Sequence, residues 1–270
     1  MSTATALDAP TGWRLWLLEF WWFGLRQAWA CLFGGVMLAL IVATHFLWPD
    51  TAPLHRYDFL FLAALLVQAA LLATGLESWE EAKVIFLFHI VGTAMELFKT
   101  YAGSWIYPEE AIFRLGGVPL FSGFMYSAVG SYLARVWRLF DFRFTRYPPF
   151  WATVAVSVLA YINFFSHHYI VDLRYPLIAA TLLLYGPCWV HYTPKRMRLR
   201  MPLALGFLLV ALFIWFAENI GTFAGAWIYP NQKEGWALVS ISKLGSWYLL
   251  MILSFVMVTW VARPEREGGA

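Results

Sequence analysis

The sequence has few charged residues and few cysteines. Only 13% of its 270 residues are Asp, Glu, Lys or Arg, against about 25% in an average soluble domain. Two cysteines, Cys31 and Cys188, are too few for a disulfide framework. The chain also lacks a phosphate-binding P-loop, a Rossmann glycine set after a strand, and the H-E-x-x-H, C-x-x-C and G-x-S-x-G motifs. This composition excludes a disordered chain, a small disulfide scaffold and a nucleic-acid-binding domain.

Apolar residues are abundant instead. They make up 61% of the chain, aromatic residues make up 19%, and the mean hydropathy is +0.63. A soluble fold of this size cannot hide that much apolar surface, because its outside must be largely wetted. The 16 Trp and 13 Tyr suit the membrane–water interface. The composition therefore predicts an all-α membrane protein with several spans, whose first partner is the lipid bilayer.

Eight segments are long and apolar enough to be read as spans of about 20 residues. Proline-containing turns such as Tyr107-Pro108 and Tyr229-Pro230 separate several of them. The expected spans are 28–48, 57–76, 82–101, 118–139, 149–168, 175–192, 202–223 and 236–261. Residues 1–27 are expected to form a cytoplasmic or interfacial segment, and residues 262–270 a cytoplasmic tail. No cleavable signal peptide is evident at the start.

The distribution of positive charge predicts the orientation. With the N-terminus inside, 13 of the 19 Lys and Arg residues fall in cytoplasmic segments, where they are expected. Both termini are then cytoplasmic, in the plasma membrane of a bacterium. The basic runs RVWRLFDFRFTR and KRMRLR are interpreted as topology signals, so no nucleic-acid partner is expected.

One string of residues occurs twice. Glu96–Pro108 returns as Glu218–Pro230 with eight of 13 positions identical, at an offset of 122. The same offset relates His45 to His167, and other matches follow in order along the chain. The sequence therefore predicts two four-span repeats, 28–139 and 149–261. Because each repeat has an even number of spans, both would keep the same orientation, about an axis along the membrane normal.

The repeated string contains the residues most suited to chemistry. Glu96 and Glu218 are expected in the outer thirds of two spans, where a carboxylate is costly and is a functional candidate by default. Lys99 lies on the helical face of Glu96. Lys243 is expected at the depth of Glu218, as its ion-pair partner. The alternative is that these charges only lock adjacent helices together.

The aromatic residues of the string allow two interpretations. The end of the string reads as a helix terminus, because glycine permits a left-handed cap and proline prevents continuation. The side chains that follow would be aromatic-belt anchors at the outer interface, or would line a pocket for a polyene, quinone or lipid. They are Trp105, Tyr107, Trp227 and Tyr229.

The histidines suggest a weaker hypothesis. His45 and His167 could join Glu96 and Glu218 in a cluster able to bind zinc, iron or manganese. The alternative for each histidine is a structural or interfacial role. Asn163 lies one turn before His167 and could orient it. His89, about 10 Å before Glu96 along the helix, suits a proton relay.

At these residues the sequence resembles the uncharacterised bacterial membrane proteins grouped as domain-of-unknown-function family 817. The resemblance covers nearly the full chain, from about Trp29 to Trp260, and brings no established activity. More distantly, the stretch from Glu96 to Pro119 is similar to part of the carotenoid-biosynthesis membrane hydratases and heterodimer-type lycopene cyclases. Those families place acidic residues in spanning helices and act on long isoprenoids.

Three functions remain open from the sequence. The leading hypothesis is an enzyme acting on an isoprenoid or lipid-like substrate, with Glu96 and Glu218 as acid and base and the four aromatic residues against the substrate. The second is a proton-coupled transporter that uses His89, Lys99 and Lys243 beside the carboxylates. The third is a structural or accessory subunit. The sequence names no cofactor, substrate or oligomeric state.

Overall fold

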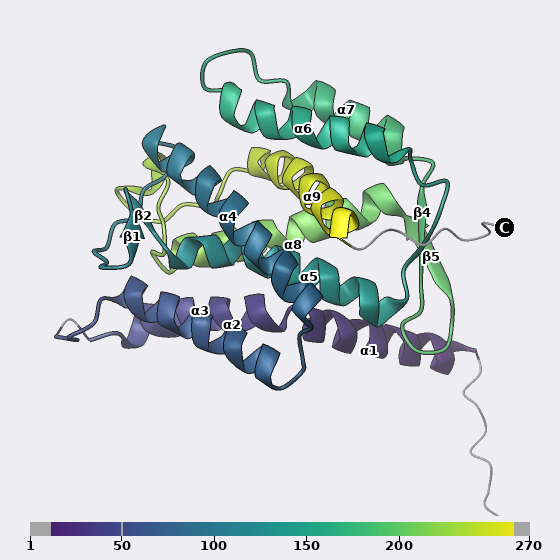
Figure 1. Cartoon of the computed structure of the whole chain (residues 1–270), viewed down its shortest axis with the longest axis horizontal. Coiled ribbons are helices and arrows are strands. Elements are labelled where there is room, and N and C mark those ends of the chain that lie inside the picture. The colour runs from purple at the N-terminus through teal and green to yellow at the C-terminus, as the bar shows by residue number, and fades with distance from the viewer. Residues whose placement is uncertain (1–11, 50, 262–270) are drawn as a thin grey trace, which may run out of the picture.

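The computed structural model describes residues 12–49 and 51–261, and this part of the chain is mostly helical (Figure 1). Its helices are α1 (Trp13–Ala30), α2 (Leu32–Leu47), α3 (Arg56–Ala73), α4 (Trp79–Tyr101), α5 (Phe121–Phe140), α6 (Phe150–Ser166), α7 (Arg174–Tyr185), α8 (Leu203–Phe223) and α9 (Ser242–Val261), with a short 3₁₀ helix at Pro230–Gln232. The expected C-terminal tail and both chain ends lie outside the described residues.

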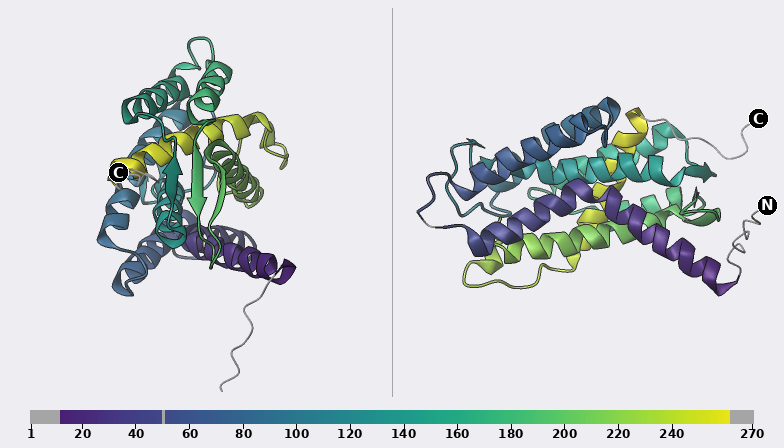
Figure 2. Two further views of the ribbon diagram at one scale, coloured as in Figure 1. Left: turned by 90° about the vertical axis from the view of Figure 1, so that its right-hand side faces the viewer. Right: turned by 90° about the horizontal axis from the view of Figure 1, so that it is seen from below.

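The helices pack around two central members, α5 and α9. Helix α5 contacts α1, α2, α3 and α4, whereas α9 contacts α6, α7 and α8, and α9 also contacts α4 and α5. In Figure 1 the pair α6 and α7 lies above the central helices and the pair α2 and α3 lies below them. The left view of Figure 2 shows the same separation from the side.

Several helices present apolar side chains to the outside, as a bilayer requires. Leu66, Leu183 and Phe213 are 71%, 81% and 71% exposed. Within the described residues, three helices are long and apolar enough to cross a membrane, Arg56–Ala73, Leu203–Phe223 and Ser242–Trp260, and α1 with α2, bent by 67°, would make a fourth. The chain is therefore a membrane protein with several apolar helices.

The junction of α1 and α2 lies at Cys31, close to the expected start of the first span at residue 28. Helix α1 is largely exposed, but its Glu19 is buried. The Glu19 carboxylate accepts hydrogen bonds from the backbone N–H groups of Lys195, Arg196 and Met197 at 2.9–3.1 Å. One acidic side chain thus fastens α1 to a distant loop.

Five short strands correct the all-α prediction. They are β1 (Arg114–Leu115), β2 (Val118–Pro119), β3 (Arg143–Thr145), β4 (Trp189–Tyr192) and β5 (Leu199–Pro202). The order of the larger sheet is β3-β4-β5, and both of its pairs are antiparallel. Strand β4 occupies the expected end of the sixth span, because α7 ends at Tyr185 before Gly186-Pro187. Helix α9 likewise begins at Ser242, six residues after the expected start of its span.

The two sheets mark opposite ends of the molecule (Figure 1). The β1–β2 end holds the hairpin and the loops that follow α4 and α8. The β3–β5 end holds both basic runs, since β3 in the first run pairs with β4, and β5 contains the end of the second.

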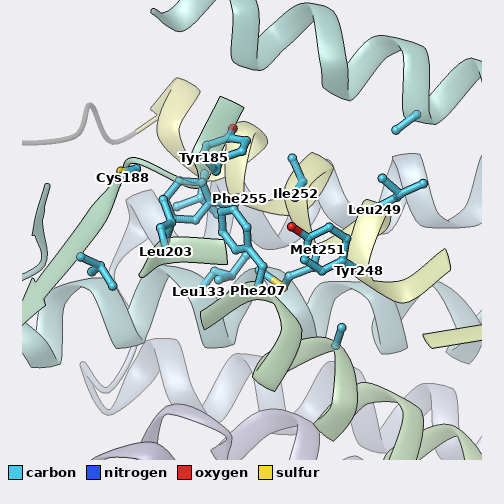
Figure 3. Close-up of a cluster of buried hydrophobic side chains, with 14 of the residues drawn as sticks. Leu133, Tyr185, Cys188, Leu203, Phe207, Tyr248, Leu249, Met251, Ile252 and Phe255 are labelled. Atoms are coloured by element: carbon cyan, nitrogen blue, oxygen red, sulfur yellow. The ribbon is translucent and has the colours of Figure 1, made fainter. Parts of the chain in front are cut away.

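The core is apolar with a few paired charges. Figure 3 shows the part of it where Tyr185, Phe207 and Phe255 meet between α7, α8 and α9. Arg135 was expected among the cytoplasmic topology charges, but its side chain is fully buried. It donates to Glu77 at 2.7 Å, and Ser131 donates to the same oxygen. A buried guanidinium needs such a partner, because its desolvation is costly.

Candidate functional site

The two copies of the repeated string end their helices with the same turn. Gly103 and Gly225 have φ angles of 70° and 65°, in the left-handed region that glycine adopts without steric cost. The N–H of Ser104 donates to the carbonyl of Lys99 at 2.9 Å, and the N–H of Ala226 donates to that of Gly221 at 3.0 Å. This bond from C″ to C3 belongs to the Schellman motif.

The two turns bring the strings together. Ile106 and Ile228, at equivalent places in the strings, pair in an antiparallel bridge. Each N–H donates to the carbonyl of the other residue at 3.0 Å. Since the two bonds are reciprocal, the aromatic residues on either side of the bridge lie close together, and the rings of Trp105 and Tyr229 meet edge to face at 6.0 Å.

Glu96 lies at the centre of the first half of the site. Its side chain is 5% exposed. Trp105 Nε1 and Tyr107 Oη donate to Oε2 at 2.8 and 2.6 Å, and Tyr126 Oη of α5 donates to Oε1 at 2.8 Å. All three donors are neutral, so the carboxylate is held by hydrogen bonds and not by a salt bridge.

Glu218 has a related environment in the second half. Glu218 is 4% exposed. Tyr229 Oη donates to Oε1, and Trp247 Nε1 of α9 donates to Oε2 at 2.7 Å. Trp227 differs from Trp105, because its ring packs on Gly221, where a Cβ would overlap it. Glycine at the position equivalent to Lys99 thus makes room for the indole.

Two of these donors were missed by the sequence analysis. Tyr126 and Trp247 lie on α5 and α9, outside the repeated string, and an offset of 122 does not align them. They are 121 residues apart, as are the first residues of the two helices, Phe121 and Ser242. A search that allowed a one-residue shift after the string would have paired them as hydrogen-bond donors.

Burial of the string aromatics argues against the aromatic-belt interpretation for three of them. Trp105, Tyr107 and Tyr229 are 7%, 9% and 7% exposed, whereas belt residues lie at the membrane surface. Their polar atoms face the carboxylates. They belong to the interior of the β1–β2 end.

Lys243 lies beside both halves without a direct ion pair. Among the described residues no salt bridge joins it to Glu218, contrary to expectation. Its ammonium instead lies 4.5 Å from the ring centre of Tyr229 and 5.4 Å from that of Trp105. Both oxygens of Glu218 already have neutral donors, and the aromatic faces provide the cation with a favourable contact.

Lys99 turns away from Glu96 toward the start of the loop between α6 and α7. The residue is 4% exposed. Its Nζ lies 2.9 Å from His168 Nε2, 3.4 Å from His167 Nε2 and 4.1 Å from the ring centre of Phe164. The sequence analysis gave no role to His168 and so missed this contact.

The expected metal cluster is not assembled. In the described ranges no group of three or more His, Cys, Asp and Glu side chains could hold a metal ion. His45 packs against Phe46 and Phe223 at ring distances of 4.8 and 5.9 Å. His167 faces Lys99, and both carboxylates are occupied by aromatic donors, so the four predicted ligands do not converge.

Asn163 holds a loop. Its Nδ2 donates to Asp172 at 3.0 Å, and its Oδ1 accepts from the N–H of Leu173 at 2.8 Å. The contact with His167 Nδ1, at 2.9 Å, comes from the Asn163 backbone carbonyl. Partial burial raises the pKa of Asp172, but hydrogen bonds from Asn163 and the Arg174 N–H, together with the Arg174 charge, outweigh it and lower the pKa below its ordinary value.

His89 lies two turns before Glu96 on α4. Its Nδ1 is buried without a hydrogen-bond partner, as is Thr93 Oγ1 one turn later, and both atoms face Gly123 of α5. The ring packs on Phe124 at 4.6 Å. These two polar atoms extend from Glu96 toward the middle of the helix bundle.

An apolar groove reaches the two missed donors. It lies between α4, α5, α8 and α9, and it is lined almost entirely by aliphatic, Met and aromatic side chains. The lining comprises Phe88, Val91, Gly92, Met95, Tyr126, Val129, Ile214, Trp247, Leu250, Met251, Leu253, Ser254 and Met257. Tyr126 and Trp247 are half-buried, so each has one side toward this groove and its polar atom on a carboxylate.

Comparison with known proteins places the chain among uncharacterised relatives. The model of the family described as "Protein of unknown function (DUF817)" matches residues 19–255. The uncharacterized protein YoaT of Bacillus subtilis (strain 168) is 46% identical over 246 residues, which are 91% of this chain and 92% of the relative. The crystal structure of a mycobacterial Insig homolog, MvINS from Mycobacterium vanbaalenii, has a TM-score of 0.49 and 15% identity, over 70% of this chain and 98% of that one.

Proposed function

The chain belongs to the family DUF817, and we propose that it is a plasma-membrane enzyme that acts on an isoprenoid or lipid-like substrate. One observation carries this proposal. The apolar groove is lined by Tyr126 and Trp247, and these side chains donate directly to Glu96 and Glu218. The groove has a volume of only about 20 Å³, so a hydrocarbon chain enters it as the lining side chains move apart, and it would then lie one side chain away from two buried carboxyl groups.

The membrane arrangement forms part of the proposal. Helices α2 to α9 are the eight spans, and α2–α5 and α6–α9 are two parallel repeats. Helices α2, α3 and α4 pack on α5, and α6, α7 and α8 pack on α9, which supports the repeats, as do the matching turns at Gly103 and Gly225. Helix α1 also packs on α5 and lies outside the repeats. The β3–β5 end, which holds both basic runs, is cytoplasmic, and so are both termini. The carboxylates then lie toward the outer face.

The chemistry we propose is proton transfer to an alkene. When Glu96 is protonated, its proton passes to the Tyr126 oxygen while the Tyr126 hydroxyl proton goes to an alkene carbon. The π electron pair forms the new C–H bond, and the neighbouring carbon becomes cationic against the face of Trp247. The Glu218 carboxylate behind Trp247 stabilises the cation. The relay then runs in reverse: the Tyr126 oxygen takes a proton from an adjacent carbon while the hydroxyl proton returns to Glu96, and the electrons of that C–H bond form the new double bond. Atoms and charge balance without a co-reactant.

Tyr126→Phe tests this mechanism. It removes the relay hydroxyl and leaves the aromatic ring in the groove. We expect a deletion strain that carries Tyr126→Phe to keep the altered isoprenoid and lipid profile of the deletion, and the wild-type gene to restore it. The matched control is Tyr132→Phe, on the same helix, whose hydroxyl donates to Gln27 instead. An unchanged inventory in the deletion strain, with no turnover by purified protein, would overturn the proposal.

A proton-coupled transporter is the second candidate. The buried, unpartnered polar atoms of His89 and Thr93 favour it, because they continue the polar path from Glu96 along α4. In proteoliposomes such a carrier would show proton-driven substrate flux that Glu96→Gln and Glu218→Gln abolish. Flux that both variants leave unchanged would argue against it.

A further inference from the structure

The groove has a chemically distinct end. On α4 its lining follows one helical stripe, with Phe88, Gly92 and Met95 spaced by four and three residues. The next position on that stripe is Lys99, one turn nearer the β1–β2 end. The apolar wall formed by α4 therefore ends at an ammonium group.

The opposite wall ends in the same way. On α9 the lining includes Trp247, Met251 and Ser254, and Lys243 lies one turn before Trp247 on the same face. Helix α9 starts at the β1–β2 end, where α4 finishes, so both lysines lie at one end of the groove. Lys99 lies 2.9 Å from His168, which contacts Ser104 at 3.4 Å, and Lys243 lies over the ring of the next residue, Trp105.

Neither lysine has a carboxylate partner among the described residues. Lys99 contacts two imidazoles and a phenyl ring, and Lys243 lies over two aromatic rings. The nearby carboxylates have other partners, since Asp172 pairs with Arg174 at 3.1 Å and Glu96 and Glu218 accept from neutral donors. Ammonium groups partly withdrawn from water without a directly bonded carboxylate are costly, and an anion between them would add to the attraction that Glu218 and Glu96 exert on Lys243.

We infer that the site takes an anionic amphiphile, a phosphate head on an unbranched or isoprenoid hydrocarbon tail. The tail lies in the groove, and the phosphate lies between Lys99 and Lys243 with the Nε2 atoms of His167 and His168 beside it. Each oxygen of a phosphate group accepts hydrogen bonds, so one phosphate can accept from several separate N–H groups. The inference rests on the proposed function, because it names the substrate class of the same groove.

Binding to purified protein in dodecyl maltoside tests this class without any turnover. The probes are farnesyl phosphate, farnesol, dioleoyl phosphatidic acid and inorganic phosphate, measured by microscale thermophoresis. We expect farnesyl phosphate to bind at least about tenfold more tightly than farnesol, since charge-assisted hydrogen bonds are the strong ones. Equal binding of the two would overturn the inference. Phosphatidic acid binding as tightly as farnesyl phosphate would support the class and identify a phospholipid as the source.

Variants locate the head group. Lys99→Met and Lys243→Met keep the apolar stem and remove a charge that is buried at Lys99 and half-buried at Lys243, so both should fold. Each should weaken farnesyl phosphate about tenfold and leave farnesol unchanged. The matched control is Lys83→Met, also on α4, where the lysine is exposed and pairs with Glu80. If Lys99→Met and Lys243→Met lose no more affinity for farnesyl phosphate than Lys83→Met does, the inference is overturned. Inorganic phosphate that binds as tightly as farnesyl phosphate would also overturn it. Tyr126→Phe should bind normally, so a failed reaction stays distinguishable from failed binding.

Discussion

At the scale of the residue, the two buried glutamates are stabilised by neutral donors. Glu96 accepts from two tyrosines and a tryptophan, and Glu218 from one of each. A hydrogen bond to a charged group contributes about 1.5–3 kcal/mol. Such bonds keep a carboxylate in place without fixing its charge to a cation, which suits a group that must gain and lose a proton.

Glu96→Gln should destabilise the protein by about 1–3 kcal/mol, because the amide nitrogen cannot accept from the donors that faced that oxygen. The measurement is thermal unfolding in dodecyl maltoside. Glu80→Gln is the control on the same helix, since that side chain is 67% exposed and should change the stability little. If Glu96→Gln and Glu80→Gln both unfold at the melting temperature of the wild type, the hydrogen bonds to Glu96 contribute nothing to the stability of the fold.

Asp172 should make stability depend on pH. Its pKa is lower in the folded protein than in the unfolded chain, so its contribution is present above the unfolded pKa of about 3.9. The contribution is lost as the pH falls through the folded value. Asp172→Asn should therefore melt below the wild type at pH 7, and the difference should shrink below about pH 4. A difference that stays constant down to pH 3 would contradict this assignment.

At the scale of the element, helix ends decide where the site forms. The turns at Gly103 and Gly225 reverse the chain after α4 and α8, and so direct Tyr107 and Tyr229 back to glutamates on their own helices. The sequence predicted both helix ends from the glycine and proline of the string. It could not predict which atoms the aromatic rings would meet, because that depends on the crossing of α4 with α5 and of α8 with α9.

Gly103→Ala and Gly225→Ala should each cost about 1–2 kcal/mol, the penalty of a left-handed conformation for an L-residue. Space is not the cause, since nothing lies within 4 Å of a Cβ at either position. Gly35→Ala is the control, because Gly35 is helical and equally open, and alanine should be neutral or stabilising there. Melting temperatures that fall no further for the two turn glycines than for Gly35 would show that the turns can relax.

The other element-scale predictions had mixed success. Strands β3, β4 and β5 were missed because they are short, and because β3 and β5 overlap the basic runs, where charge was taken as a topology signal. The metal site was wrong because positions related by one offset along the chain need not converge. His45 and His167 lie on α2 and at the end of α6, the helices on opposite sides of the central layer (Figure 1).

At the scale of the whole molecule, two similar sets of helices meet at one end. The Ile106–Ile228 bridge joins the repeated strings, and α5 contacts α9 beside the groove. The two halves of the site differ at two pairs of positions. Gly221 is the counterpart of Lys99, and Trp247 is the counterpart of Tyr126. The composition predicted a membrane protein and the repeated string predicted where its polar residues gather. The groove depends on packing between four helices and has no signature in the sequence.

Photo-crosslinking measures most directly whether the groove holds an apolar substrate. The probe is farnesol with a diazirine near the end of its chain, applied to the purified wild-type protein with and without excess farnesol. We expect labelled peptides to contain Met95, Tyr126 or Trp247, and excess farnesol to protect them. Labels confined to outward side chains such as Leu183 and Phe213, unaffected by excess farnesol, would contradict a substrate site between α4 and α9.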